Sequence, residues 1–152
     1  MDAVFKVENG VFNYRVAGVM IENGHVLLHK QVNDKHWALP GGRVKVLEDS
    51  VAGIKREFME ELGVPVKIEH LLWVTENFFT YNGSNFHELG FYYRVSSEKM
   101  MNHDEAFYGL EGERLLYQWF PINKLDEITL YPDFLKTDLK NLPACTQHII
   151  IR

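Results

Sequence analysis

Residues 42–64 read GRVKVLEDSVAGIKREFMEELGV, and this stretch organises the rest of the chain. We expect Asp49 or Ser50 to cap the start of a helix, because their side-chain oxygens can accept hydrogen bonds from free backbone N–H groups. Gly63 is expected to end the helix, since glycine adopts the left-handed C-terminal conformation without steric cost. At roughly 100° per residue, the helix turns one apolar stripe towards a core, namely Val51, Ile54, Phe58 and Leu62.

Three carboxylates lie beside this apolar stripe. Glu57, Glu60 and Glu61 fall on one neighbouring arc, where like charges repel and cost helix stability. Arg56, four residues before Glu60, can offset part of that repulsion. A hard divalent cation would offset more, because Mg2+ and Mn2+ prefer oxygen ligands. The competing interpretation is a solvated acidic helix face, which is the commoner origin of such charge runs.

The same stretch resembles the Nudix box, G-x5-E-x7-R-E-U-x-E-E-x-G-U, in which U is a bulky apolar residue. Every specified position is filled in this chain, by Gly42, Glu48, Arg56, Glu57, Phe58, Glu60, Glu61, Gly63 and Val64. The preceding Leu39-Pro40-Gly41 also looks like that family. A match at this many spaced positions is far more specific than a lone glycine motif.

The resemblance implies an α/β/α sandwich around a mixed β-sheet, with the box forming a loop–helix–loop. It also implies an enzyme that hydrolyses the diphosphate linkage of a nucleoside diphosphate joined to another group, with water attacking phosphorus. A nucleoside triphosphate, oxidised or not, a nucleotide sugar and an ADP-ribose-type compound all fit this class. Mg2+, with Mn2+ as a substitute, is the implied cofactor. The alternative is a domain that senses nucleotides without hydrolysing them. Such domains usually have degenerate boxes, whereas the box in this chain is intact.

Residue roles follow from the matched positions. The implied metal ligands are Glu57, Glu60, Glu61 and the backbone carbonyl of Gly41. Arg56 would hold the glutamates by charge-assisted hydrogen bonds, and Glu48 would steer either Arg56 or a metal-bound water. The implied catalytic set is Glu48, Arg56, Glu57 and Glu60. Gly42 and Arg43 are the candidate substrate contacts, although Arg43 reads equally well as a surface arginine.

Two assignments remain open from the sequence. The general base could be a glutamate of the box or a distant acid, which leaves Glu57, Glu60, Glu88, Glu111 and Glu113 as candidates. The aromatic residues that could stack a base, or simply pack in a core, are Phe78, Phe79, Tyr81, Phe91 and Tyr92. Trp37 is expected in the core rather than at the mouth of the site, and His25 and His29 are expected on the surface.

Composition narrows the class of protein. With 152 residues, of which 46% are hydrophobic and 13% aromatic, the chain is expected to form one globular domain, residues 1–152. A net charge of −5 disfavours binding of a nucleic-acid polymer, but a small phosphorylated substrate remains compatible if a metal supplies positive charge. The single Cys145, the lack of a signal-peptide pattern and the lack of a long apolar stretch favour a cytoplasmic protein without membrane contact. A homodimer is left open.

β-prone runs and turn pairs dominate the remainder of the chain. Asn-Gly pairs at residues 23–24 and 82–83 predict hairpins. A short helical turn is expected at residues 121–125, a helix at 132–139, and irregular structure at 96–109. The expected strands cover residues 4–7, 11–14, 15–21, 25–30, 66–75 with 76–81 as a continuation or a loop, 86–95, 115–121 and 146–151.

Overall fold

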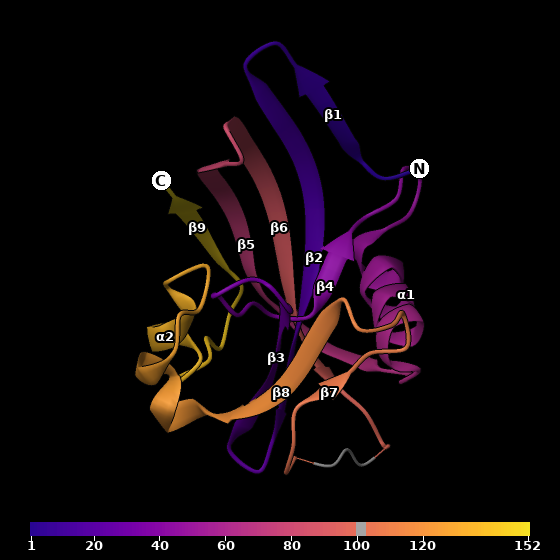
Figure 1. The fold of residues 1–152 in the computed structure, drawn as a ribbon, viewed down its shortest axis with the longest axis vertical. Helices are drawn as coiled ribbons and strands as arrows, with labels where there is room; N and C mark the ends of the chain where they lie inside the picture. Colours follow the sequence, from indigo (N-terminus) through magenta and orange to yellow (C-terminus); the bar gives the residue numbers. More distant parts are fainter. Residues whose placement is uncertain (100–102) are drawn as a thin grey trace.

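The computed structural model describes residues 1–99 and 103–152, and Figure 1 shows helices on either side of a central sheet. The elements in chain order are β1 (Val4–Val7), β2 (Gly10–Glu22), β3 (His25–Gln31), β4 (Gly41–Arg43), α1 (Ser50–Leu62), β5 (Lys67–Tyr81), β6 (Ser84–Ser96), β7 (Phe107–Tyr108), β8 (Leu115–Pro121), the 3-10 helix η1 (Ile122–Glu127), α2 (Leu135–Asp138) and β9 (Gln147–Ile151).

The sheet is mixed, as the predicted fold class requires. Its main order is β7-β8-β3-β2-β6-β5-β9, and β1 and β4 also pair with β2. The β2–β6 and β5–β9 pairs are parallel, whereas the other pairs are antiparallel. Strand β2 therefore lies at the centre and contacts four other strands.

β2 is longer than predicted, because residues 11–14 and 15–21 form one strand rather than two. Residues 11–20 pair in unbroken register with residues 86–95 of β6, so nothing interrupts the strand between Tyr14 and Arg15. β5 is likewise one strand as far as Tyr81. Both predicted Asn-Gly hairpins are confirmed. Asn23 and Gly24 have φ of 49° and 73°, the left-handed conformation that a tight hairpin turn requires.

Helix α1 begins and ends where the sequence predicts. The Asp49 carboxylate accepts a hydrogen bond of 2.8 Å from the backbone N–H of Ala52, and Gly63 has φ of 65°. Ile54, Phe58 and Leu62 are buried against β2, β6 and β8 in a first core. Burying each such side chain contributes about 1.5–3 kcal/mol, so the apolar face fixes the helix to the sheet.

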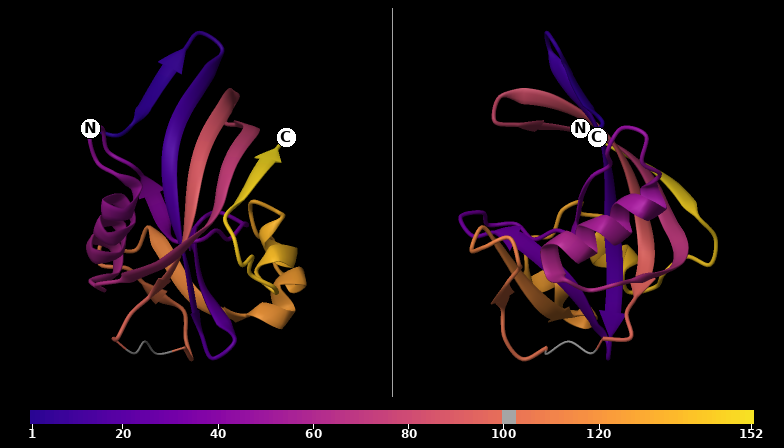
Figure 2. Two further views of the ribbon diagram at one scale, coloured as in Figure 1. Left: turned by 180° about the vertical axis from the view of Figure 1, so that it is seen from behind. Right: turned by 90° about the vertical axis from the view of Figure 1, so that its right-hand side faces the viewer.

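A second core lies on the opposite face of the sheet. Leu125 of η1 and Leu135 of α2 pack there against Trp73 of β5 and Trp37, which confirms Trp37 as a core residue. Figure 2 shows α1 and α2 on opposite sides of the sheet, so the predicted α/β/α arrangement is confirmed. The helix predicted at residues 132–139 is shorter, because Leu135, Lys136 and Thr137 each bond the carbonyl three residues earlier in tight turns.

The segment predicted as irregular, residues 96–109, contains the short strand β7, which pairs with β8. Residues 100–102 of that segment lie outside the described part of the chain. Within residues 1–99 and 103–152, no helix has both the length and the apolar character needed to span a bilayer.

Candidate active site

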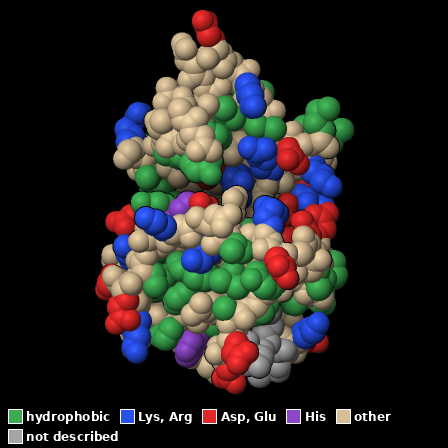
Figure 3. Space-filling model, viewed as in Figure 1, with side chains coloured by type: hydrophobic (Ala, Val, Ile, Leu, Met, Phe, Trp, Pro, Cys, Tyr) green, Lys and Arg blue, Asp and Glu red, His purple; other side chains and the backbone are tan. Residues whose placement is uncertain are grey.

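A hollow of about 490 Å³ lies between α1, β4 and the segment that precedes β8. Figure 3 shows this face hollowed across its middle, with charged side chains gathered on the α1 side. We call it the polar hollow, and among the residues that line it are Gly41, Gly42, Arg43, Arg56, Glu57, Glu60, Glu61, Arg15, His29, Glu111 and Arg114. The first seven come from the stretch at residues 42–64 and the Gly41 that precedes it, whereas the other four come from distant segments.

The glycines let a carboxylate lie against the backbone. A Cβ on Gly42 would lie 2.5 Å from the Oε1 atom of Glu57, and a Cβ on Gly41 would lie 2.0 Å from the carbonyl oxygen of Val16. Neither position can carry a larger side chain without moving its neighbours. The Gly41-Gly42 pair is therefore needed for close packing of β4 against β2 and against Glu57.

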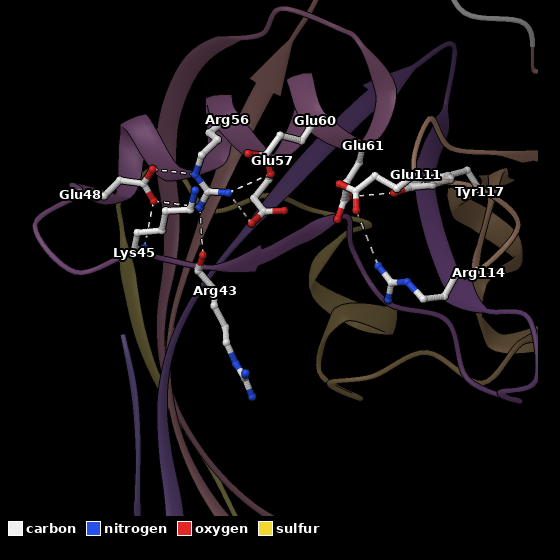
Figure 4. A network of polar contacts seen from close by, with 10 residues as sticks. All are labelled: Arg43, Lys45, Glu48, Arg56, Glu57, Glu60, Glu61, Glu111, Arg114 and Tyr117. Atoms are coloured by element: carbon white, nitrogen blue, oxygen red, sulfur yellow. Dashed lines mark hydrogen bonds and ion pairs between the residues drawn. The ribbon is translucent and has the colours of Figure 1, made fainter. Parts of the chain in front are cut away.

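Arg56 ties the acidic side chains of the stretch together (Figure 4). Its Nε and Nη2 atoms donate to the two carboxylate oxygens of Glu48 at 2.7 and 2.9 Å. Its Nη1 atom donates to Glu57 at 2.9 Å and to Glu60 at 3.2 Å. Nη2 also donates to the backbone carbonyl of Arg43 at 3.0 Å, which anchors β4 to the helix.

Glu48 is part of this network but does not line the polar hollow. The hydrogen bond from Arg56 lowers the pKa of Glu48 to about 2, and the same bond raises the pKa of Arg56. Both groups are therefore charged at neutral pH. Glu48 and Arg56 are in direct contact, and their predicted catalytic roles stay predictions.

Glu61 has a different environment from the other two glutamates of the helix. It is only 7% exposed, and the hydroxyl of Tyr117 on β8 donates a 2.8 Å hydrogen bond to its Oε2 atom. Burial, followed by the nearby charges of Glu57 and Glu111, raises the pKa of Glu61 to about 7. Sequence reasoning missed Tyr117, because it lies 56 residues from Glu61 in a strand whose pattern indicates only packing.

Arg43 extends away from the glutamates, as Figure 4 shows. Its Nε atom is buried and has no hydrogen-bond partner among the described residues. A buried N–H donor without a partner costs free energy, so this guanidinium is available to an anionic ligand.

The structure separates the distant candidates for the general base. Glu111 lines the polar hollow and pairs loosely with Arg114 at 4.0 Å. Glu88 lies instead on β6, where burial raises its pKa and the amide of Asn13 donates to it at 3.4 Å. Glu113 is exposed and is not among the residues that line the hollow. Of the distant candidates, Glu111 is thus the one that lines the same hollow as the glutamates of the helix.

His29 is buried, which makes its predicted surface position wrong. It is 8% exposed, its ring lies 5.3 Å from that of Tyr117, and its Nδ1 atom has no partner among the described residues. Burial, with the charges of Arg15 and Arg114, lowers the pKa of His29 to about 3, so its imidazole is neutral at physiological pH. The prediction failed because Leu27 and His29 share one face of β3, and Leu27 lies in the first core.

A second cavity of about 580 Å³ adjoins the polar hollow, and we call it the aromatic cleft. The two share Arg15, His29, His36 and Ala38. The residues that give the cleft its character are Asn77, Phe78, Phe79, Tyr81, Glu88, Tyr92 and Tyr131. Of the predicted stacking candidates, only Phe91 lies elsewhere, on the opposite face beside the first core.

The donor chemistry suits a hard cation, because the glutamates supply oxygen ligands close together, and because burial and then the charges of Glu57 and Glu111 disfavour the ionised form of Glu61. In the part of the chain that is described, no three His, Cys, Asp or Glu side chains stand in metal-binding geometry. Each of the three carboxylates has a partner within the fold, since Arg56 bonds Glu57 and Glu60 while Tyr117 bonds Glu61.

Comparison with known proteins places the fold. A MutT-like protein of Streptomyces ambofaciens is 36% identical over 63 residues, which are 41% of this chain and 41% of that protein. The crystal structure of a NUDIX hydrolase from Nitrosomonas europaea superposes with a TM-score of 0.66 at 22% identity, covering 96% of this chain and 81% of that one. A MutT NUDIX hydrolase from Burkholderia pseudomallei gives a TM-score of 0.55 at 25% identity, covering 73% and 84%.

The decisive comparison is with the family itself. The NUDIX domain model matches residues 12–142, which include the whole of the stretch at residues 42–64 and every strand of the sheet except β1, β9 and the first residues of β2. The match also contains Arg15, His29, Glu111 and Tyr117, which line or support the polar hollow. The chain therefore belongs to the NUDIX domain family.

Proposed function

We propose that this protein is a Mg2+-dependent hydrolase that cleaves the diphosphate linkage of a nucleoside diphosphate joined to another group. One observation carries the proposal: four glutamates and several arginines line one hollow, and that hollow adjoins a cavity with aromatic walls. A substrate with a diphosphate and a planar base would match these two cavities, with the diphosphate in the polar hollow and the base in the aromatic cleft. Membership of the NUDIX domain family supports the same reaction class.

The diphosphate would lie in the polar hollow. Arg43 has an unpartnered buried N–H there, and Arg15 and Arg114 line the same space, so cationic donors are available to the phosphate oxygens. The base would lie in the aromatic cleft, where Phe79 and Tyr81 are partly exposed and can stack on it. Arg15 and His29 lie where the two parts of such a substrate would join.

The residues that would hold the metal are Glu57, Glu60, Glu61 and the carbonyl of Gly41. Bound Mg2+, or Mn2+ in its place, would neutralise phosphate charge and lower the pKa of a coordinated water. Arg56 keeps Glu57 and Glu60 beside the hollow, and Glu48 keeps Arg56 in place. Removing Glu48 would therefore act on the site through Arg56.

In the proposed reaction a water oxygen attacks phosphorus, a new P–O bond forms, and the bridging P–O bond breaks. The proton lost by the water goes to a carboxylate, and the bridging oxygen leaves with the second phosphate. Glu57 and Glu60 remain candidates for that base, together with Glu111. We do not assign the role to Glu88 or Glu113, which lie away from the polar hollow.

The test is a panel of nucleoside triphosphates, oxidised nucleotides, nucleotide sugars and ADP-ribose, assayed with Mg2+ and with excess chelator. We expect hydrolysis of at least one compound with Mg2+ and none with chelator. In 18O-labelled water, the label should appear on a product phosphate. Full activity in chelator would refute the metal role, and tight binding without turnover across the panel would favour the nucleotide-sensing alternative.

A further inference from the structure

Two buried tyrosines bond to opposite ends of helix α1. The hydroxyl of Tyr93 on β6 is hydrogen-bonded at 2.6 Å to the hydroxyl of Ser50, in the first turn. The hydroxyl of Tyr117 on β8 donates at 2.8 Å to the carboxylate of Glu61, in the last turn. The two contacts differ in their acceptor, because Ser50 is neutral whereas Glu61 lines the polar hollow.

The Tyr117 ring is held from several sides. It is completely buried, and the ring of Phe107 stacks on it with centroids 5.6 Å apart. The ring of His29 lies 5.3 Å away, and a Cβ on Gly109 would lie only 2.8 Å from the Tyr117 ring. The tyrosine hydroxyl therefore has one position in the fold.

The segment that precedes β8 also constrains Glu61. Its backbone carbonyl accepts a 2.7 Å hydrogen bond from the N–H of Leu110, so the end of the helix and the segment before β8 are joined directly. Its side chain still has three rotatable bonds, and Tyr117 is the donor that fixes the Oε2 atom. A donor held in this way selects one orientation for a carboxylate that would otherwise sample several.

We propose that Tyr117 is a positioning residue that holds Glu61 in the orientation needed to bind the divalent cation. This inference rests on the function proposed above, in which Glu61 is a metal ligand. Hydrogen-bond partners of metal ligands orient them, and loss of such a partner typically weakens metal affinity by about 10–100-fold. The hydroxyl of Tyr117 contributes through Glu61 and does not touch the substrate.

The test compares Tyr117→Phe with Tyr93→Phe, a matched control that removes the same atom from another buried contact of the same helix. Mn2+ binding to the metal-free protein is measured by electron paramagnetic resonance, which does not depend on turnover. We expect Tyr117→Phe to bind Mn2+ about 10–100-fold more weakly. Tyr93→Phe should stay within about twofold of the wild type, because its partner is not a carboxylate.

Two further measurements separate positioning from folding. Tyr117→Phe should need more Mg2+ for half-maximal activity while its kcat at saturating Mg2+ stays close to that of the wild type. In the Glu61→Gln background, Tyr117→Phe should cause no further loss of Mn2+ affinity, because the hydroxyl acts only through that carboxylate.

Several results would overturn the proposal. Wild-type Mn2+ affinity in Tyr117→Phe would show that the hydroxyl does not position a metal ligand. Failure of Tyr117→Phe to fold, while Tyr93→Phe folds, would show that the hydroxyl serves stability. A wild type that binds no Mn2+ would refute both proposals, whereas Mn2+ binding without hydrolysis of any panel compound would refute the proposed reaction alone.

Discussion

The polar hollow and the aromatic cleft share a wall but differ in construction. Two elements that are adjacent in the chain, β4 and α1, supply Arg43, Arg56, Glu57, Glu60 and Glu61 of the hollow, and its other charged residues come from other segments. The cleft is assembled from β2, β3, β5, β6, β9 and the loops at residues 36–39 and 131–133. We therefore expect the stretch that contains β4 and α1 to carry out the reaction. We expect the separate strands of the cleft to select the group that is attached to the diphosphate.

The two regions also differ in how their charges are compensated. In the hollow, Arg56 makes five close hydrogen bonds to acidic side chains and one carbonyl, so the charges are held in place before any ligand arrives. In the cleft, the contacts of Glu88 with other described residues are long, 3.4 Å to Asn13 and 3.9 Å to Arg15. A preorganised charged site suits catalysis, whereas a loosely paired carboxylate beside aromatic rings suits ligand selection.

The largest effect is expected in the hollow, from Glu57→Gln. This change keeps the size of the side chain but removes one carboxylate that faces the proposed diphosphate site, so kcat should fall at least about 100-fold. The measurement is the initial rate on the best panel substrate with saturating Mg2+. Glu127→Gln, an exposed residue of η1, is the control and should keep wild-type activity. An active Glu57→Gln enzyme would place the reaction elsewhere.

A smaller effect, and on a different kinetic constant, is expected in the cleft from Phe79→Ala. Loss of a stacking ring costs about 1–3 kcal/mol per base, so KM should rise by about 5–100-fold while kcat changes little. Phe5→Ala on β1 removes a comparably exposed phenylalanine outside the cleft and should leave KM unchanged. If Phe79→Ala lowered kcat without affecting KM, the division between the two regions would be wrong.

His29, at the junction of the two regions, should make stability depend on pH. Its pKa is lowered to about 3 by burial, whereas in the unfolded chain it is about 6.5. Between these values the unfolded chain binds the extra proton, so the free energy of unfolding should fall as pH drops below about 6.5.

Denaturant unfolding from pH 7 to pH 4.5 measures this dependence. His29→Gln should lose about 1–2 kcal/mol less than the wild type across that range. His148→Gln, at an exposed position of β9, is the control and should follow the wild type more closely. Parallel curves for the wild type and His29→Gln would mean that His29 becomes protonated in the folded protein.

The same difference in construction explains what the sequence could predict. Helix α1, its caps and its buried face follow from local periodicity and turn chemistry within residues 49–63, and all were predicted correctly. Arg15, His29 and Tyr117 were missed, because their roles depend on which strands lie side by side. Strand β3, for example, has Trp119 and Tyr117 of β8 opposite Leu27 and His29, a pairing that no local pattern specifies. The Nudix resemblance predicted the fold class but not this pairing of side chains.

The smallest effect on stability is expected from Glu60→Gln in metal-free protein. Glu60 is 46% exposed at its side chain and makes one 3.2 Å contact with Arg56, so solvent screening leaves the pair worth under about 0.5 kcal/mol. Glu48→Gln is the matched comparison, because Glu48 is only 14% exposed and makes two close hydrogen bonds with the same arginine. Its loss should cost about 1–3 kcal/mol, since it leaves Arg56 without its strongest partner.

The stabilisation by Mg2+ should rank the two variants in the opposite order. The melting temperature of Glu60→Gln should rise less on addition of Mg2+ than that of Glu48→Gln, because only Glu60 is a proposed ligand. Equal gains would remove Glu60 from the ligand set, whereas a large metal-free loss in Glu60→Gln would make it a structural residue.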